Sequence, residues 1–375
     1  MKIKLLKENL KQALGIVERI AAKGSALPAL GAVAMKAEKN TVEFSATDLE
    51  IGIRYKVLAE TEKEGCVVVP SRLFSQVVSA LEEKEVTLVV VAGELRVESK
   101  EHQTALKTLA IEDFPIIPSL QGTEEPVELE TGEFCAGLNQ VVGMTGQNQA
   151  RPEISGVFIQ ILKEEIKVAA TDSFRLAEKT LDLHKPCVAQ ASFILPQKTA
   201  RELVSIAGGF PEKTRLYLSS SQALFDYSSK EKAQHVSLQV VSRLIEGDYP
   251  QYQDVIPREF AAKARAGRQE FISRLKAASV FSGKIQDVKV ATDPKRKGLH
   301  ISAQSSDTGR HASFLASEVS GKPLDISFNW RFLLEGLSNM KAHEVDIGFG
   351  GEDAPALIRP ASKERYLYVV MPVKA

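Results

Sequence analysis

The sequence has few cysteines, a single tryptophan and no long apolar run. Its three cysteines, Cys66, Cys135 and Cys187, are far apart and form no CxxC pair. This spacing argues against a disulfide framework or a zinc site and suits a reducing compartment. No stretch of about 18 apolar residues occurs, and the charged start MKIKLLKENL leads into none, so we expect neither a membrane span nor a signal peptide. A cytoplasmic protein is expected.

The chain also lacks an excess of charge of either sign. Its 48 Lys and Arg residues balance its 48 Asp and Glu residues. Net charge therefore does not indicate nucleic-acid binding, and any such surface requires local segregation of charge. The 375 residues are too many for one ordinary core, so we expect two or three domains.

Motifs of common catalytic and nucleotide-binding sites are missing as well. The sequence contains no GxGxxG, GxxxxGK[ST] or GxSxG, and its six histidines have neither HxxxH nor HExxH spacing. The glycine-rich GFGGED lies between two strand patterns with no helix after it, which is typical of a turn rather than a phosphate-binding loop. We therefore expect a protein that is not an enzyme, with no metal and no cofactor.

What the sequence does contain is a repeat. EFSATDLEIGIR at residues 43–54 returns as KVAATDSFRLAE at residues 167–178, and a weaker copy, SSDTGRHASF, follows at residues 305–314. An amphipathic helix pattern precedes each copy, and a strand, a second helix and two further strands come after it. The short alternating strands predict antiparallel sheets with one buried face. We predict an α+β protein of three repeats, with two helices packed on antiparallel sheets in each, at residues 1–121, 122–256 and 257–375.

The Thr-Asp pair in each of the first two copies interrupts an alternating pattern, which predicts a hairpin corner. There the carboxylate of Asp48 or Asp172 can accept backbone N–H groups that the strand ladder leaves unpaired. After the first corner, Leu49 and Ile51 are expected to share one face of a new strand. The alternative is an enzyme that uses Asp48, Asp172 and Asp307 as carboxylates. It is disfavoured because the three corners belong to different repeats.

A basic residue recurs at the start of the second helix of each repeat. Arg72, Lys198 and Arg331 each stand two places after the residue that ends the preceding strand. The helix macrodipole disfavours positive charge in this first turn, whereas bound phosphate would favour it. Three such cations would give an evenly spaced, sequence-independent contact with a nucleic-acid backbone. Three unrelated surface cations are the alternative.

Across all three repeats the chain resembles the bacterial DNA sliding clamp, the beta subunit of DNA polymerase III. The resemblance rests on RPEISGVFIQ, AATDSFRLAE, GDYPQYQDVIP and YVVMPVKA, in that order. It implies three DNA-clamp domains and a head-to-tail homodimer that forms a six-domain ring with helices lining the hole. It also implies a non-catalytic processivity factor that encircles double-stranded DNA without reading its sequence. The partners implied, bound through short linear motifs, are the replicative polymerase alpha subunit, the clamp-loader delta subunit, translesion and repair polymerases, ligase and mismatch-repair proteins.

The resemblance implies three sets of site residues. The residues that we expect to line the hole and contact DNA are Arg19, Lys23, Arg72, Lys198, Arg201 and Arg331, together with Asn148, Gln149 and Arg151, which match a loop region that contacts DNA in the family. Those implied for a peptide-binding groove between the second and third domains are Ile154, Thr171, Ser173, Phe174, Arg175, Leu176, Pro250, Val255, Val369, Met371, Pro372 and Val373. Those implied for the dimer interface are Thr104, Leu106, Val280 and Phe281.

The sequence departs from the family in and around the groove. Ser173-Phe174 stands where members commonly have Gly-His, Asp254 stands where they have a basic residue, and the chain ends Val-Lys-Ala where they often end Met-Arg-Leu. We expect a more aromatic pocket with a less basic rim, so that the preferred peptide differs from the common Gln-Leu-x-Leu-Phe type. A clamp paralogue that serves one specialised polymerase, or that withstands an inhibitor, is the alternative.

Overall fold

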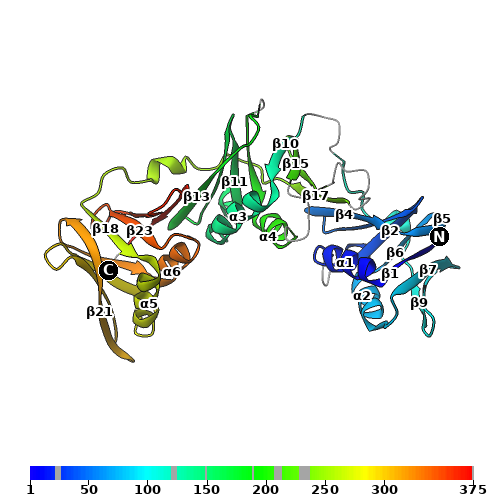
Figure 1. Cartoon of the computed structure of the whole chain (residues 1–375), viewed down its shortest axis with the longest axis horizontal. Coiled ribbons are helices and arrows are strands. Elements are labelled where there is room, and N and C mark those ends of the chain that lie inside the picture. Colours follow the sequence, from blue (N-terminus) through cyan, green and yellow to red (C-terminus); the bar gives the residue numbers. More distant parts are fainter. Residues whose placement is uncertain are drawn as a thin grey trace. The chain divides into compact units, whose positions relative to one another are not determined.

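The computed structural model describes residues 1–21, 27–119, 125–147, 150–187, 190–206, 213–227 and 237–373. These residues form two compact units (Figure 1). One comprises Met1–Cys135 with Arg201–Leu244, and the other comprises Ala136–Ala200 with Ile245–Ala375. Within the described ranges no helix is both long and apolar enough to span a membrane.

The first unit contains two antiparallel sheets. Its strands are β1 (Lys2–Leu6), β2 (Ala32–Glu38), β3 (Thr41–Thr47), β4 (Ile51–Leu58), β5 (Glu60–Lys63), β6 (Gly65–Pro70), β7 (Glu85–Val91), β8 (Glu94–Glu98), β9 (Gln103–Lys107), β10 (Val127–Glu130), β15 (Lys213–Leu218), β16 (Gln222–Asp226) and β17 (Ser237–Arg243). One sheet has the order β5-β1-β7-β8-β9, and the other has the order β10-β15-β16-β17-β4-β3-β2-β6.

The second unit is built on one long sheet. Its strands are β11 (Gly156–Ile161), β12 (Glu165–Thr171), β13 (Arg175–Asp182), β14 (Ala191–Pro196), β18 (Ala262–Gly267), β19 (Asp287–Asp293), β20 (Gly298–Ser305), β21 (Gly309–Gly321), β22 (Leu324–Asn329), β23 (Glu344–Phe349), β24 (Ala356–Pro360) and β25 (Tyr366–Val370). They follow the order β14-β11-β12-β13-β25-β24-β23-β18-β21-β20-β19-β22.

The two large sheets repeat one strand order. In the first unit the run β6-β2-β3-β4-β17-β16-β15-β10 corresponds strand for strand to β14-β11-β12-β13-β25-β24-β23-β18 in the second. In each run the fourth and fifth strands come from consecutive repeats, so one sheet joins two repeats. The division between the units therefore falls inside the second repeat. The predicted architecture of repeated helices and antiparallel sheets is confirmed.

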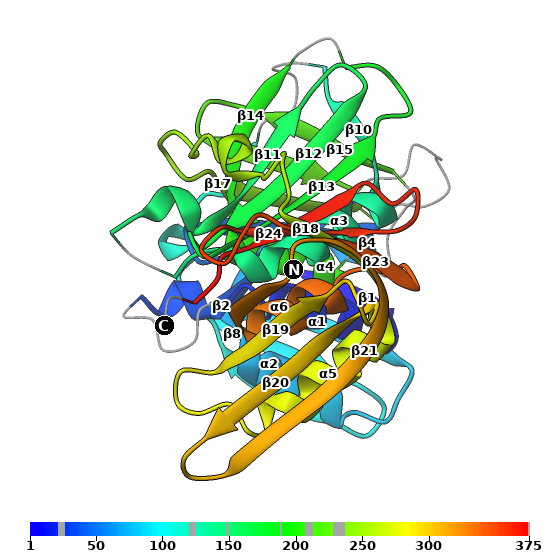
Figure 2. The same cartoon turned by 90° about the vertical axis from the view of Figure 1, so that its left-hand side faces the viewer.

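Each unit packs helices against its sheets through an apolar stripe. In the first unit the first helix buries Leu10, Leu14 and Val17, at the spacing that places side chains on one helical face. In the second unit the fifth helix buries Phe271 and Leu275 behind the long strands β20 and β21 (Figure 2). The helices are α1 (Lys7–Val17), α2 (Ser71–Ala80), α3 (Thr131–Val141), α4 (Gln197–Ile206), α5 (Arg268–Ser279) and α6 (Trp330–Ser338). Helix α1 lies beside α2, and α5 lies beside α6 (Figure 1).

The second helix of each repeat begins where the sequence predicts. Helices α2 and α4 begin directly after a proline, and α6 begins after Asn329. The Asn329 side chain accepts a hydrogen bond from the backbone N–H of Arg331 at 2.9 Å, as an N-cap residue does. Arg72 and Lys198, like Arg331, are the second residue of their helix. The predicted place of these cations in the first helical turn is confirmed.

Candidate functional site

The Thr-Asp pair folds into the same turn in the first two repeats. In the first unit the Oδ1 of Asp48 accepts the backbone N–H groups two and three residues later at 3.0 and 2.7 Å, and Leu49 has φ +77°. In the second unit the Oδ1 of Asp172 accepts the equivalent two groups at 3.0 Å each, and Ser173 has φ +76°. The predicted hairpin corner is confirmed, and the two carboxylates hold the turn.

The third copy is built differently. Ser305 takes the place of the threonine, because its Oγ accepts the backbone N–H of Asp307 at 3.2 Å, as the Oγ1 of Thr47 accepts that of Leu49 at 3.0 Å. Asp307 therefore occupies the position of Leu49 and not that of Asp48. The three aspartates therefore do not occupy equivalent positions, which counts further against the alternative that uses them as catalytic carboxylates.

In the second unit this turn borders an apolar pocket of about 220 Å³. Every predicted groove residue up to Met371 lines it, namely Ile154, Thr171, Ser173, Phe174, Arg175, Leu176, Pro250, Val255, Val369 and Met371. Arg151, Gln251 and Tyr252 line it too. Pro372 and Val373 are not among the lining residues of this pocket, and their place in the groove wall stays a prediction. The backbone N–H of Val373 donates to the carbonyl oxygen of Ser327 on β22 at 2.8 Å.

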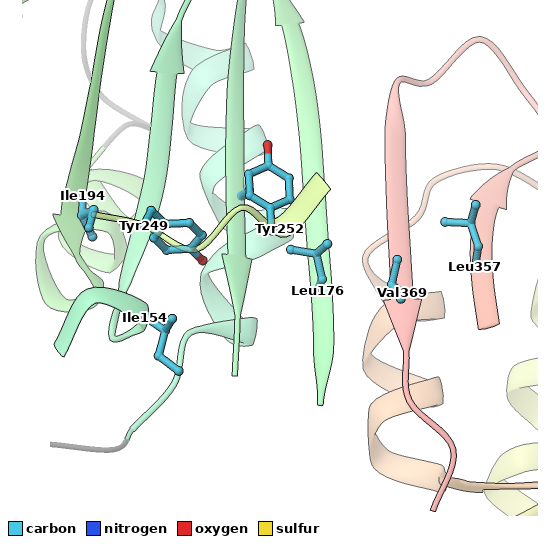
Figure 3. Close-up of a cluster of buried hydrophobic side chains, with 8 residues drawn as sticks. Ile154, Leu176, Ile194, Tyr249, Tyr252, Leu357 and Val369 are labelled. Carbon is cyan, nitrogen blue, oxygen red and sulfur yellow. The ribbon is translucent and has the colours of Figure 1, made fainter. Parts of the chain in front are cut away.

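The floor of this pocket is a row of residues that face one another across neighbouring strands. Leu176 on β13 lies opposite Thr171 on β12 and, on its other side, opposite Val369 on β25. Val369 in turn lies opposite Leu357 on β24 (Figure 3). Directly opposite residues of an antiparallel pair point to the same face of the sheet. The second and third repeats thus both contribute to the apolar floor.

Aromatic side chains lie at the pocket and in the core beside it. Tyr252 lines the pocket and begins a short turn at Tyr252–Val255. The Tyr249 ring stacks on Phe158 in the adjoining buried cluster, with 4.8 Å between ring centroids. The Tyr252 hydroxyl donates a hydrogen bond to the Oε2 of Glu178 at 2.6 Å. Burial, and then the Glu178 carboxylate, raises the pKa of Tyr252, so the hydroxyl stays protonated. Sequence reasoning missed Tyr252, although the spaced aromatic residues of GDYPQYQDVIP were a signal for it.

The rim exposes apolar side chains. Phe174 is 63% exposed, Val255 is 54% exposed and Met371 is 37% exposed. A gathering of exposed apolar side chains beside a pocket is typical of a surface that binds a partner. Among the residues that line the pocket, Phe174 and Tyr252 are aromatic, and the expectation that the pocket is more aromatic than in the family stays a prediction.

Arg175 holds the second and third repeats together within this unit. Its Nε donates to Asp172 at 2.9 Å, its Nη1 to Glu335 at 2.6 Å and its Nη2 to the carbonyl of Gly143 at 3.1 Å. The guanidinium lies 4.4 Å from the centroid of the Phe332 ring. Burial alone would lower the pKa of Arg175, but the hydrogen bonds with Glu335 and Asp172 raise it overall. Arg175 is a charged residue that positions the pocket wall.

The first unit fills the equivalent space. Gly52 takes the place of Leu176 in the corresponding row, with Val241 opposite it. Ile117 packs here against Leu224 and Val241. A Cβ atom added to Gly52 would lie 2.6 Å from the Cγ2 of Ile117. The side chain of Ile117 therefore covers the position that forms the pocket floor in the second unit.

Four of the predicted DNA-contacting side chains are exposed on helices. Arg72 lies on α2, Lys198 and Arg201 lie on α4, and Arg331 lies on α6. The Arg331 guanidinium lies 5.3 Å from the centroid of the Trp330 ring. These cations are accessible to a large anionic partner.

Other members of that set are engaged within the chain. Arg19 follows α1, and its Nε lies 2.7 Å from the Oε2 of Glu202. Arg151 lines the groove and pairs with Glu153 at 3.0 Å. These ion pairs reduce the positive charge that either arginine presents. The remaining members, Lys23, Asn148 and Gln149, lie outside the described residues.

The predicted interface residues of the first unit lie on an edge strand. Thr104 and Leu106 are on β9, the last strand of its sheet. Thr104 is half-buried, but Leu106 is only 4% exposed. The side chain of Leu106 belongs to the core of its own unit, so at this edge Leu106 presents its main chain, and its place in the dimer interface stays a prediction.

The predicted interface residues of the second unit also adjoin a strand edge. Strand β21 pairs with β20 along residues 309–316 but with β18 only from Ser317 onward. Residues 309–316 of β21 therefore pair with β20 along one edge, and among the described residues no strand pairs with their other edge. The Phe281 ring stacks on His311 of this half with 5.9 Å between centroids, and neighbouring Val280 is 68% exposed.

The fold of this chain is found in solved DNA clamps. The crystal structure of the DNA polymerase sliding clamp from Bacillus subtilis is similar with a TM-score of 0.94, at 24% identity over 100% of this chain and 99% of that chain. The beta subunit of DNA polymerase III from Thermotoga maritima is similar with a TM-score of 0.90, at 23% identity and the same coverage. The chain thus has the fold of these clamps.

Sequence comparison gives the family within this class. Models of the N-terminal, central and C-terminal domains of the DNA polymerase III beta subunit match residues 1–118, 128–251 and 253–374. The chain therefore belongs to the DNA polymerase III beta subunit family. Beta sliding clamps from Streptomyces coelicolor and Synechococcus elongatus are 28% and 26% identical to it, and each alignment covers 100% of this chain and 99% of the relative.

Proposed function

We propose that the protein is a DNA sliding clamp. Two copies join head to tail in a closed ring around duplex DNA and tether the replicative polymerase to it. The observation that carries this proposal is the succession of N-terminal, central and C-terminal clamp domains along one chain. Three domains in each of two chains make a six-domain ring, which closes because the interface is heterologous and repeats by rotation.

Topology, more than affinity, keeps such a ring on DNA. Dissociation requires the ring to open, so weak and screened contacts with phosphates are enough and permit sliding. The exposed cations at the second position of α2, α4 and α6 support this proposal. They recur at one position in each repeat, and contacts with phosphates carry no sequence information.

The two strand edges support the ring. Strand β9 and the first half of β21 present backbone N–H and C=O groups that can continue a sheet into a second chain. Val280 and Phe281 lie beside the β21 edge, where an exposed valine and a half-buried phenylalanine can be covered by the partner chain. One edge belongs to the first repeat and the other to the third, as a head-to-tail contact requires.

The groove supports the tethering role. An apolar floor with aromatic side chains beside it suits an extended peptide that anchors one or two apolar side chains. Met371 at the rim is a flexible and polarisable residue of the kind that surfaces with several partners use. The proposed ligands are linear motifs of the replicative polymerase alpha subunit, the clamp-loader delta subunit, translesion and repair polymerases, ligase and mismatch-repair proteins.

The molar mass in solution tests the ring directly. Light scattering on the purified full chain should give twice the mass of one chain over a wide range of protein concentration. A mass equal to that of one chain would leave the domain fold intact but contradict a stable two-chain ring.

A further inference from the structure

The groove floor continues into a second pocket on the same face of the sheet. Val369 lies opposite Leu357, Leu357 lies opposite Gly348, and Gly348 lies opposite Lys263. Because opposite residues of antiparallel pairs share a face, this row runs from the groove across three further strands. Leu357, Gly348 and Lys263 line a pocket of about 800 Å³, which we call the basic pocket.

Phe260 stands between the two pockets. It packs against the buried cluster of the groove, to which Tyr252 and Leu357 belong, and it also lines the basic pocket. Its ring lies directly on Gly348, where an added Cβ atom would be 2.4 Å from the ring carbon Cδ1. A glycine is therefore required for this approach of ring to strand. The Nζ of Lys263 lies 5.6 Å from the centroid of the Phe260 ring.

The basic pocket has an excess of positive charge. Its charged lining residues are Lys263, Arg265, Lys297, Arg359, Glu318 and Asp346. The guanidinium of Arg265 donates to both carboxylate oxygens of Asp346, at 2.7 and 3.0 Å. Among the described residues no carboxylate oxygen lies within 4.0 Å of the charged nitrogens of Lys263, Lys297 or Arg359. These three cations are available to an anionic ligand.

We propose that the basic pocket binds an acidic stretch of the same partner polypeptide whose apolar motif occupies the groove. This inference rests on the proposed function of the groove. Three strand spacings separate Val369 from Lys263 by about 14 Å, and an extended chain covers that distance in about four residues. A polypeptide anchored over Val369 therefore places its carboxylates beside Lys263 and Arg359.

The continuity with the groove favours a peptide over another anion. The connecting row is apolar at Leu357 and is bordered by the Phe260 ring, and both suit the side chains and backbone of an extended peptide. Glu318 and Asp346 leave the pocket with a mixed charge pattern. That pattern selects spaced carboxylates over a continuous phosphate backbone.

Labelled synthetic peptides test the inference by fluorescence anisotropy on the full-length protein. The reference is Gln-Leu-Ser-Leu-Phe, and the test peptides carry three Asp or three Asn residues beyond a Gly-Ser spacer of about four residues, on either side of the motif. For one of the two placements, before or after the motif, we expect the peptide with three Asp residues to bind about fivefold more tightly than the matching peptide with three Asn residues at low ionic strength. This difference in affinity should be lost at high ionic strength.

Two double variants separate the basic pocket from general surface charge. In Lys263→Gln/Arg359→Gln the advantage of the Asp peptide should disappear, while the reference peptide binds as before. In Lys163→Gln/Lys289→Gln, which removes two exposed lysines elsewhere on the same unit, the advantage should persist.

The outcomes distinguish failure of the inference from failure of the groove. Equal binding of the Asp and Asn peptides, with the reference peptide bound, overturns the inference and leaves the groove proposal standing. Failure of the folded protein to bind any of these peptides, with or without Asp residues, counts against the groove and the inference together. An oligo-dT strand is the third probe. If the protein binds this strand, if Lys263→Gln/Arg359→Gln abolishes that binding, and if the Asp peptide binds no more tightly than the Asn peptide, the pocket is assigned to nucleic acid and the inference is overturned.

Discussion

Leu176 and Val369 face each other on the paired strands β13 and β25 and form the centre of the groove floor. They come from the second and third repeats, so the pocket exists only while these two strands stay paired. In the first unit Gly52 holds the position of Leu176, and Ile117 covers it. In the first unit, Ile117 thus fills the space over Gly52 that corresponds to the open pocket over Leu176 in the second unit.

Gly52→Ala should destabilise the first unit by about 1–3 kcal/mol, because the new Cβ atom overlaps Ile117 in a packed core. Alanine would otherwise be favourable at this strand position. Urea denaturation of the two single variants and of the double variant Gly52→Ala/Ile117→Ala gives their free energies of unfolding, and from these the interaction energy between the two substitutions. The double variant should lose less stability than the sum of the two single losses, whereas additive losses would show that the two residues do not compete for space.

Phe174→Ala should weaken binding of the Gln-Leu-Ser-Leu-Phe peptide by about fivefold, since about 1 kcal/mol of apolar contact is lost. Because Phe174 is exposed, the free energy of unfolding should change by no more than about 0.5 kcal/mol. Leu73→Ala removes an exposed apolar side chain from the other unit and should leave peptide binding unchanged. Equal affinities for the wild-type protein and Phe174→Ala would remove Phe174 from the groove.

Reversing Arg72, Lys198 and Arg331 to Glu should lower the fraction of protein loaded on DNA while the dimer mass stays the same. The physical reason is repulsion between the new carboxylates and phosphates, so the loss should be greatest at low ionic strength. The matched control reverses the charge at Lys39, Lys163 and Lys289 by substitution with Glu. These are exposed lysines that lie outside the helices. Unchanged loading of the helix variant would exclude these three residues from DNA contact.

Val280→Glu/Phe281→Glu should convert the dimer to monomers, because two charges would be buried against the partner chain. Size exclusion with light scattering measures the mass, and circular dichroism checks that the domains remain folded. Leu58→Glu, which changes another exposed apolar residue, should remain dimeric. A folded double variant that still has the dimer mass would refute this interface.

Burial raises the pKa of the Cys135 thiol to about 12. At about pH 8 this thiol is almost wholly protonated and unreactive, whereas the exposed Cys66 is accessible to reagent. Iodoacetamide should therefore label Cys66 in the folded protein and Cys135 only after unfolding or as the pH approaches that raised pKa. Peptide mass spectrometry measures the two rates, and fast labelling of Cys135 in the folded chain would contradict its burial.

The sequence was sufficient to predict the features that depend on local pattern. The turn held by Asp48 and Asp172 follows from an interrupted alternation, and the starts of α2 and α6, one residue before Arg72 and Arg331, follow from a strand-ending proline or asparagine. Leu49 was expected on a strand face but lies in the turn at φ +77° and is 49% exposed. A single alternating pattern does not show where a strand ends and a turn begins.

Features that depend on long-range pairing were not predictable in this way. The pairing of β4 with β17, and of β13 with β25, joins consecutive repeats, and it places the division between the units inside the second repeat. The hydrogen bond between Tyr252 and Glu178 depends on the path that the irregular segment containing Tyr252 takes across the sheet. The basic pocket likewise requires the register of strands whose order no local pattern gives.

Retention on circular and linear DNA tests the central claim most directly. The protein is loaded with a clamp loader and ATP onto a nicked circular duplex, separated from free protein, and then followed as the circle is cut at one restriction site. A sliding clamp should stay on the intact circle, resist a wash at high ionic strength, and leave after the cut, because a ring can slide off a free end. Protein that dissociates equally from cut and uncut circles would contradict topological binding.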